Sequence, residues 1–266
     1  MFTSHVSSTP GSLDYLFTAF YALTVCNAAE VVILIFMTFK RYGGCYFWAL
    51  FVTALGLIVS TIGNAYYFYN VGPNKSASIS LALIGWCGFV NGQAVVLWSR
   101  LHIVVQNRRL LIAILVMIIF NAVTLCPTTF ILAYLGNVPD STSTAAYVYR
   151  TWEAIQLALF TAQEAIISVT YIWQVTRLSH FFADGPKRKI IHQFVAISAI
   201  ILLMDGVLLV VQFSDNRSVQ IPLKGLVYSL KLKLEFAVLQ RLVTFAGHPQ
   251  SSLGVNTEHG PLGSSS

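Results

Sequence analysis

The chain has 266 residues, of which 56% are hydrophobic and only 10% are charged, and its formal net charge is +6. Soluble domains carry about 25% charged residues, so this composition excludes an ordinary soluble protein and indicates several membrane spans. The basic residues are scattered at the ends of apolar segments. This pattern favours contact with anionic membrane lipid and gives no reason to expect nucleic acid as a partner.

Seven apolar segments follow one another, each long enough for the ~20 residues that a helix needs to cross a bilayer. The predicted fold class is therefore all-α, a polytopic membrane protein built as a seven-transmembrane-helix bundle. We expect 1–13 to be a short extracellular segment, 14–245 to be the transmembrane domain, and 246–266, rich in Gly, Ser and Pro, to be a disordered cytosolic tail. The predicted spans are 14–39, 45–69, 79–105, 110–135, 149–175, 190–213 and 219–245.

The orientation in the membrane is predicted from the distribution of Lys and Arg. The first, third and fifth connections hold Lys40, Arg41, Arg108, Arg109, Arg177, Lys187, Arg188 and Lys189, whereas the others and the adjoining helix starts hold only Lys75, Arg150 and Arg217. Because cytosolic loops are enriched in basic residues, we expect the N-terminus outside and the C-terminus in the cytosol. Both N-x-S/T sequons then fall outside, which makes Asn74 and Asn216 candidates for glycosylation.

The seventh segment contains YSLKLKLEFAVL, in which polar and apolar residues alternate as in a half-buried strand. A lone strand cannot cross hydrocarbon because its backbone groups would lack partners, so the segment is predicted to be helical. At about 100° per residue, Lys224, Tyr228, Lys231 and Glu235 share a face roughly 60° wide. Lys233 lies about 180° from Lys224, so it must snorkel or find a different partner.

Acidic residues in other spans predict a buried charge layer with this face. Counted at ~1.5 Å per residue, Glu30, Glu164 and the 231–235 stretch lie about 20 Å deep, and Asp205 lies about 12 Å deep, nearer to Lys224. The predicted layer, which is acidic by one charge, contains Glu30, Glu164, Asp205, Lys224, Lys231, Lys233 and Glu235, with Tyr228 on the same face. The layer either joins the helices or forms a site for a polar ligand, ion or proton, and both interpretations stay open.

The remaining motifs do not predict a functional site. Arg100 and His102, at the cytosolic end of the third span, are expected to snorkel toward lipid headgroups rather than to signal. The chain has no Cys/His spacing typical of a metal site and no nucleophile or metal-hydrolase motif, so we predict no metal, no cofactor and no enzymatic activity.

The stretches NGQAVVLWSRLHIVV, YIWQVTRL, LLMDGVLLVVQF and YSLKLKLEFAVLQRLV resemble a family of fungal seven-span integral membrane proteins. The resemblance implies a fungal source and an architecture distantly similar to G-protein-coupled and other rhodopsin-like receptors. The chain departs from those receptors where they have an acidic-Arg-aromatic triplet, since Ser99 precedes Arg100 here, and its seventh span lacks an Asn-Pro-x-x-Tyr motif. Coupling to a G protein is therefore only an analogy.

Three functions follow from these features. The first is a receptor-like sensor, with membrane lipid, a small-molecule ligand and a cytosolic signalling partner as its partners. The second is a transporter or proton-coupled channel that uses the charge layer. The third is a retinal-binding protein using Lys231, which is disfavoured because the third span has no carboxylate to act as counter-ion. The predicted location is the plasma membrane, with an internal membrane as the alternative.

Overall fold

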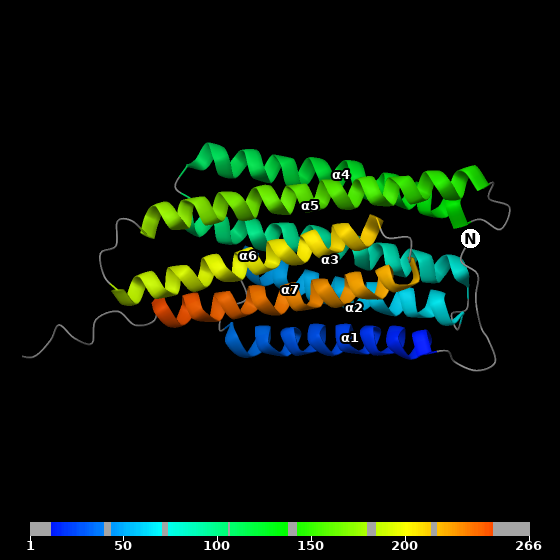
Figure 1. Cartoon of the computed structure of the whole chain (residues 1–266), viewed down its shortest axis with the longest axis horizontal. Helices are drawn as coiled ribbons and strands as arrows, with labels where there is room; N and C mark the ends of the chain where they lie inside the picture. The colour runs from blue at the N-terminus through cyan, green and yellow to red at the C-terminus, as the bar shows by residue number, and fades with distance from the viewer. Residues whose placement is uncertain are drawn as a thin grey trace, which may run out of the picture.

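The computed structural model describes residues 12–39, 44–70, 74–105, 107–137, 143–179, 185–213 and 217–246. These residues form seven α-helices that lie side by side along the long axis of the molecule, with consecutive helices antiparallel (Figure 1). The helices are α1 (Ser12–Thr38), α2 (Cys45–Tyr69), α3 (Lys75–Val104), α4 (Arg108–Asn137), α5 (Ser143–Ser179), α6 (Gly185–Phe213) and α7 (Arg217–Ala246). The predicted all-α class is confirmed for this part of the chain.

Six of these helices, α1 to α6, are long and apolar enough to cross a membrane, so the chain is a multi-pass membrane protein. The exception is α7, which is less apolar because Lys224, Lys231, Lys233 and Glu235 lie within it. The helices α5 and α6 begin before the predicted spans at 149 and 190, because a helix can continue past the hydrocarbon into the polar region. Most of the predicted terminal segments, 1–13 and 246–266, lies outside the described residues.

The helices form a closed ring in chain order, in which α7 returns to pack against α1. Inside this ring, α3 also contacts α5, and α2 also contacts α7. The most extensive contact joins α2 and α3, where glycines let the two backbones approach closely. A Cβ added to Gly56 would lie 2.6 Å from the Phe89 nitrogen, and one added to Gly85 would collide with the backbone of Ser60.

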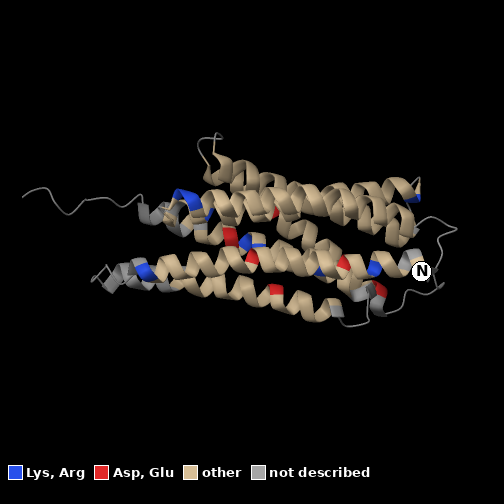
Figure 2. Cartoon of the chain, turned by 90° about the horizontal axis from the view of Figure 1, so that it is seen from above, with Lys and Arg blue, Asp and Glu red and all other residues tan. Residues whose placement is uncertain are grey.

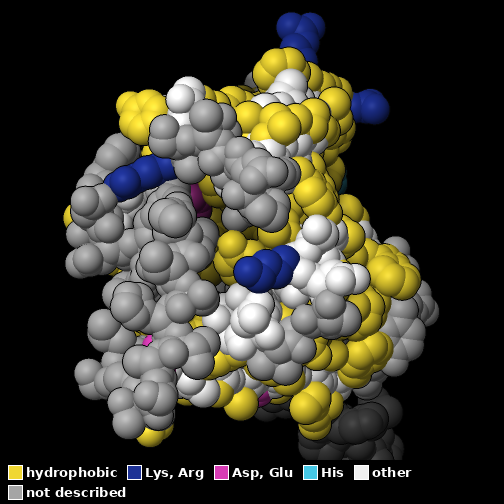
Figure 3. Space-filling model, turned by 90° about the vertical axis from the view of Figure 1, so that its right-hand side faces the viewer, with side chains coloured by type: hydrophobic (Ala, Val, Ile, Leu, Met, Phe, Trp, Pro, Cys, Tyr) yellow, Lys and Arg dark blue, Asp and Glu magenta, His cyan; other side chains and the backbone are white. Residues whose placement is uncertain are grey.

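The outer faces of the helices are apolar. Many large hydrophobic side chains are exposed there, including Val123 on α4, Val169 on α5, and Leu203 and Val210 on α6. Viewed from the end at which α1 begins, hydrophobic side chains cover much of the visible flank of the bundle (Figure 3). This distribution suits a bundle surrounded by lipid tails, where no hydrophobic force drives such side chains inward. Figure 2 shows, by contrast, that charged residues also lie midway along the helices.

Candidate functional site

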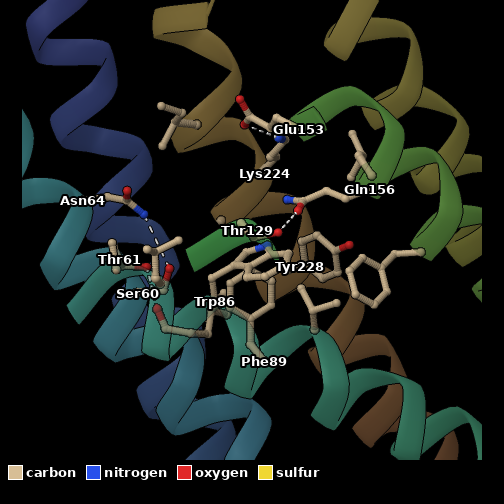
Figure 4. Close-up of a pocket in the computed structure, with 18 of the residues that line it drawn as sticks. Ser60, Thr61, Asn64, Trp86, Phe89, Thr129, Glu153, Gln156, Lys224 and Tyr228 are labelled. Atoms are coloured by element: carbon tan, nitrogen blue, oxygen red, sulfur yellow. Dashed lines mark hydrogen bonds and ion pairs between the residues drawn. The ribbon is translucent and has the colours of Figure 1, made fainter. Parts of the chain in front are cut away.

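A cavity of about 140 Å³ opens between the helices in the half of the bundle where α1, α3, α5 and α7 begin. Lys224 on α7 and Glu153 on α5 form an ion pair in its wall, with 3.1 Å between Lys224 Nζ and Glu153 Oε1 (Figure 4). Each of these side chains is 18% exposed, so the pair is accessible from the cavity. Aromatic rings complete the lining, and they belong to Tyr21, Trp86, Phe89, Tyr149, Phe160 and Tyr228.

A hydrogen-bonded group from α4 and α5 borders the same cavity. Thr129 donates to Gln156 and accepts a hydrogen bond of 3.0 Å from the indole nitrogen of Trp152. Asn64 on α2 donates to the hydroxyl of Ser60 over 3.4 Å. In Figure 4, Asn64 and Ser60 lie to the left of the Glu153–Lys224 pair and Gln156 lies to its right. Thr129 and the aromatic residues Trp86, Phe89 and Tyr228 lie below the pair. The lining thus combines apolar rings with a few fixed polar groups, as ligand pockets do.

Beyond Tyr228, α7 carries a second group of charges that is closed to solvent. The ammonium of Lys231 contacts Glu164 on α5 and lies 2.5 Å from Oδ1 of Asp205 on α6. The exposed fractions of these three side chains are 0%, 2% and 2%. Lys231 Nζ also lies 4.7 Å from the centre of the Tyr228 ring, within the range of a cation–π interaction. We refer to Lys231, Glu164 and Asp205 as the Lys231 triad.

A third charged group follows one turn later on α7. Arg100 on α3 donates to the backbone carbonyl of Glu235 over 2.6 Å, and its Nη2 lies 3.0 Å from Oε2 of the Glu235 carboxylate. Arg100 is 4% exposed and Glu235 is 0% exposed. The hydroxyl of Tyr46 on α2 donates to the same carbonyl over 3.4 Å. This contact joins α2, α3 and α7 at the far side of the Lys231 triad.

The three charged groups share one face of α7. Lys224, Lys231 and Glu235 are spaced by seven and four residues, so they fall within roughly 40° around the axis and about 10 Å and 6 Å apart along it. Tyr228 lies between the first two and contributes both to the cavity wall and to the environment of Lys231. The polar face expected for the seventh helix thus forms a continuous row from the cavity into the bundle.

Two members of the predicted layer lie elsewhere. Glu30 on α1 and Lys233 on α7 form an ion pair of 2.5 Å at the outer surface of the bundle, with exposed fractions of 56% and 30%. The expectation that both belong to a buried layer is therefore wrong. The expectation rested on the depth of Glu30 along its helix and not on the direction in which its side chain points. The next residue, Val31, lies on the buried face of α1. One residue turns a side chain by about 100° around the helix.

The predicted partner of Asp205 is also corrected. Counting residues placed Asp205 nearer to Lys224, but its carboxylate contacts Lys231, and Lys224 pairs with Glu153. Side chains lean toward the N-terminus of their own helix. Because α6 and α7 are antiparallel (Figure 1), Asp205 and Lys231 lean toward each other and close the difference in depth.

At the end of α3, the structure separates two residues that were expected to behave alike. Arg100 does not snorkel, since its guanidinium is buried against Glu235. His102 is exposed, and its ring lies 5.8 Å from that of Trp98. Of the two glycosylation candidates, Asn74 is exposed at the N-cap of α3, and Asn216 lies outside the described residues.

Several residues of the site were not among the predicted site residues. Glu153 lies on the polar side of the fifth span that also carries Glu164, and the helical period of the sequence predicts that this side faces inward. Thr129 and Trp86 lie in apolar segments with no distinguishing spacing, so only the packing of α3, α4 and α5 shows their place at the cavity. Among the described residues, no group of three or more His, Cys, Asp or Glu side chains is arranged to hold a metal ion.

Comparison with protein families shows that residues 6–252 match the model of a domain of unknown function, DUF7703. The match includes every helix described above. No curated protein and no solved structure matches the chain.

Proposed function

The chain belongs to the DUF7703 family, and we propose that it is a seven-span, receptor-like sensor that binds a small polar molecule in the cavity beside Glu153 and Lys224. One observation carries this proposal: an accessible ion pair in a cavity wall lies on the same face of α7 as two buried charged groups. A ligand that changes the first pair acts on the helix that holds the other two.

The cavity indicates the class of ligand. Its volume of about 140 Å³ is close to the ~150 Å³ of an engineered apolar cavity that admits benzene, and it is below the ~300–1,000 Å³ of sites for drug-sized molecules. The Glu153–Lys224 pair offers one negative and one positive group side by side. A small zwitterion would place its cationic group at Glu153 and its anionic group at Lys224, with its apolar part against Trp86 and Tyr228.

A response could reach the opposite end of the bundle through α7. Displacing Lys224 from Glu153 changes the position of α7 relative to α5, and the same two helices are joined by the contact of Lys231 with Glu164. Arg100 then links α7 to α3 near the expected cytosolic side. This arrangement supports a change in helix packing as the signal. The proposal also includes an orientation with the N-terminus outside and a location in the plasma membrane.

The experiment measures ligand binding by purified protein in lipid nanodiscs. Trp86 lines the cavity and Trp152 donates to Thr129 beside it, so a ligand should alter tryptophan fluorescence. Standard L-amino acids, their decarboxylated amines and small betaines form the first panel. We expect a saturable response to zwitterions and a weaker response to amines, which carry only one of the two charges.

Matched variants locate the response. Ile221→Trp fills the wall of the cavity, and Glu153→Gln removes its negative charge, so each should abolish the response. Leu203→Trp, on the exposed face of α6, adds the same ring outside the cavity and should leave the response unchanged. A response that survives Ile221→Trp, or a panel that gives no saturable change in the wild type, would refute this proposal.

A transporter or proton-coupled channel is the second candidate, and the Lys231 triad favours it because ionisable residues inside a membrane often lie on ion pathways. Measuring the flux of protons or of a solute into proteoliposomes tests this candidate. Retinal binding has less support, since Lys231 is fully buried and does not line the cavity. Protein mixed with retinal is expected to stay colourless in the visible range.

We also propose that the protein has no enzymatic activity and that its source is fungal, as the resemblance of its sequence implies.

A further inference from the structure

The buried charges in the middle of the bundle do not balance. Glu164, Asp205 and Glu235 provide three carboxylates, while Lys231 and Arg100 provide two basic groups, and all five side chains are at most 4% exposed. If all were ionised, the core would hold one excess negative charge. An uncompensated charge in a low-dielectric interior is costly, and a buried carboxylate usually avoids that cost by binding a proton.

Among the described residues, no further cation is found in contact with the triad. Around Glu164 on α5, the facing charged or titratable groups are Asp205 from α6 and Tyr228, Lys231 and Glu235 from α7. From α2, α3 and α5, the groups near Glu235 are Tyr46, Arg100 and Tyr171. The remaining described cations of α7 for which contacts are given, Lys224 and Lys233, pair with acidic residues outside this core.

The geometry of the two triad carboxyl groups suits a shared proton. Each uses one oxygen to accept from Lys231, Oε2 in Glu164 and Oδ1 in Asp205. Their second oxygens, Glu164 Oε1 and Asp205 Oδ2, are buried and accept no hydrogen bond from the described residues. The two carboxyl groups are also close enough to interact with each other. Because both carboxyl groups contact the same ammonium, a proton on either one has the other as a neighbouring acceptor.

Glu235 is a weaker position for this proton. Both oxygens of its carboxylate are also buried and accept no hydrogen bond from the described residues. Its Oε2 nevertheless lies 3.0 Å from Arg100 Nη2, in a pair of one acid with one base, whereas in the triad two acids compete for one ammonium. Two carboxylates that share a site cannot both ionise at low cost.

We propose that the Lys231 triad is a proton-binding site, in which one exchangeable proton is shared between Glu164 and Asp205. With that proton in place the triad is neutral, and its release leaves one negative charge between α5, α6 and α7. The proton site does not depend on the ligand of the cavity, because the three triad residues are buried and do not line the cavity.

Infrared spectroscopy of the protein in lipid tests this site. A protonated carboxyl group has a C=O stretch, separate from the bands of carboxylates, that shifts in D₂O. At neutral pH we expect the wild type to show one such band from a buried group. Glu164→Gln and Asp205→Asn should each remove it, because each substitution leaves one acid against one base. Lys231→Met should instead increase the band about twofold, since both acids lose their cation and take up protons.

Glu30→Gln is the matched control, because it makes the same chemical change at the outer surface and should leave the band in place. Loss of the band in Glu235→Gln but not in Glu164→Gln would overturn the assignment to the triad. A wild type without the band would overturn the proposal itself. Melting temperature provides a second measurement, since Glu164→Gln and Asp205→Asn should stay close to the wild type while Lys231→Met falls. Failure of both neutralised variants to fold would also contradict the proposal.

Discussion

Replacing Lys231 by Met should strongly destabilise the bundle. Met keeps most of the length of the side chain but removes the only basic group in contact with both Glu164 and Asp205 among the described residues. Both carboxyl groups would stay in a site that is at most 2% exposed. Breaking a buried ion pair by removing one partner costs about 3–5 kcal/mol. At about 2–4 °C per kcal/mol for a chain of this size, the melting temperature should fall by roughly 6–20 °C.

The structure also determines which second substitution restores stability. Because Lys231 faces two acids, neutralising Glu164 alone leaves Asp205 without a cation, and the reverse holds for Asp205. The triple variant Lys231→Met, Glu164→Gln, Asp205→Asn removes every charge of the triad and should recover much of the loss. Adding Glu30→Gln to Lys231→Met should recover nothing, because Glu30 pairs with Lys233 on the outer surface.

Thermal unfolding in nanodiscs, followed by tryptophan fluorescence, measures these effects. Lys75→Met is the control for the substitution itself, since Lys75 is exposed at the start of α3 and its loss should change stability by no more than about 0.5 kcal/mol. A Lys231→Met protein that melts at the wild-type temperature would refute the argument. The ammonium of Lys231 in the wild type would then have to lie in water or at the headgroups rather than in a buried triad.

Arg100→Leu leaves the buried Glu235 carboxylate without its basic partner and should cost about 3–5 kcal/mol in the same assay; unchanged melting would mean that Glu235 is neutral. Gly85→Ala places a methyl group against the backbone of α2 and should cost about 1–3 kcal/mol. The matched change Gly206→Ala meets nothing within 4 Å and should be neutral or stabilising by up to ~1 kcal/mol, so equal losses in the two variants would contradict the close-packing argument. Reporter fusions should place the N-terminus outside and the C-terminus in the cytosol, with glycan on Asn74 lost in Asn74→Gln; both termini on one side would exclude an odd number of crossings.

The class of the fold follows from the amino-acid sequence alone. An apolar composition with short polar connections requires a membrane chain, and hydrocarbon requires helices because every backbone group must find a partner inside its own segment. That constraint also decided the case of α7, whose alternating pattern suggests a strand. The helical period then placed Lys224, Tyr228, Lys231 and Glu235 on one face, because it depends only on spacing within one helix.

The partners that these residues contact depend on how the seven helices pack. The distance of a residue along its helix can be counted from the sequence, but the rotation of one helix against another depends on packing across the whole bundle. This is why Glu30 lies at the outer surface although its counted depth matches that of Lys231. It is also why Asp205 meets Lys231, since the antiparallel lean of the two side chains offsets their difference in depth. The cavity has the same origin, because its lining comes from six helices whose contacts are fixed only when the ring of helices closes.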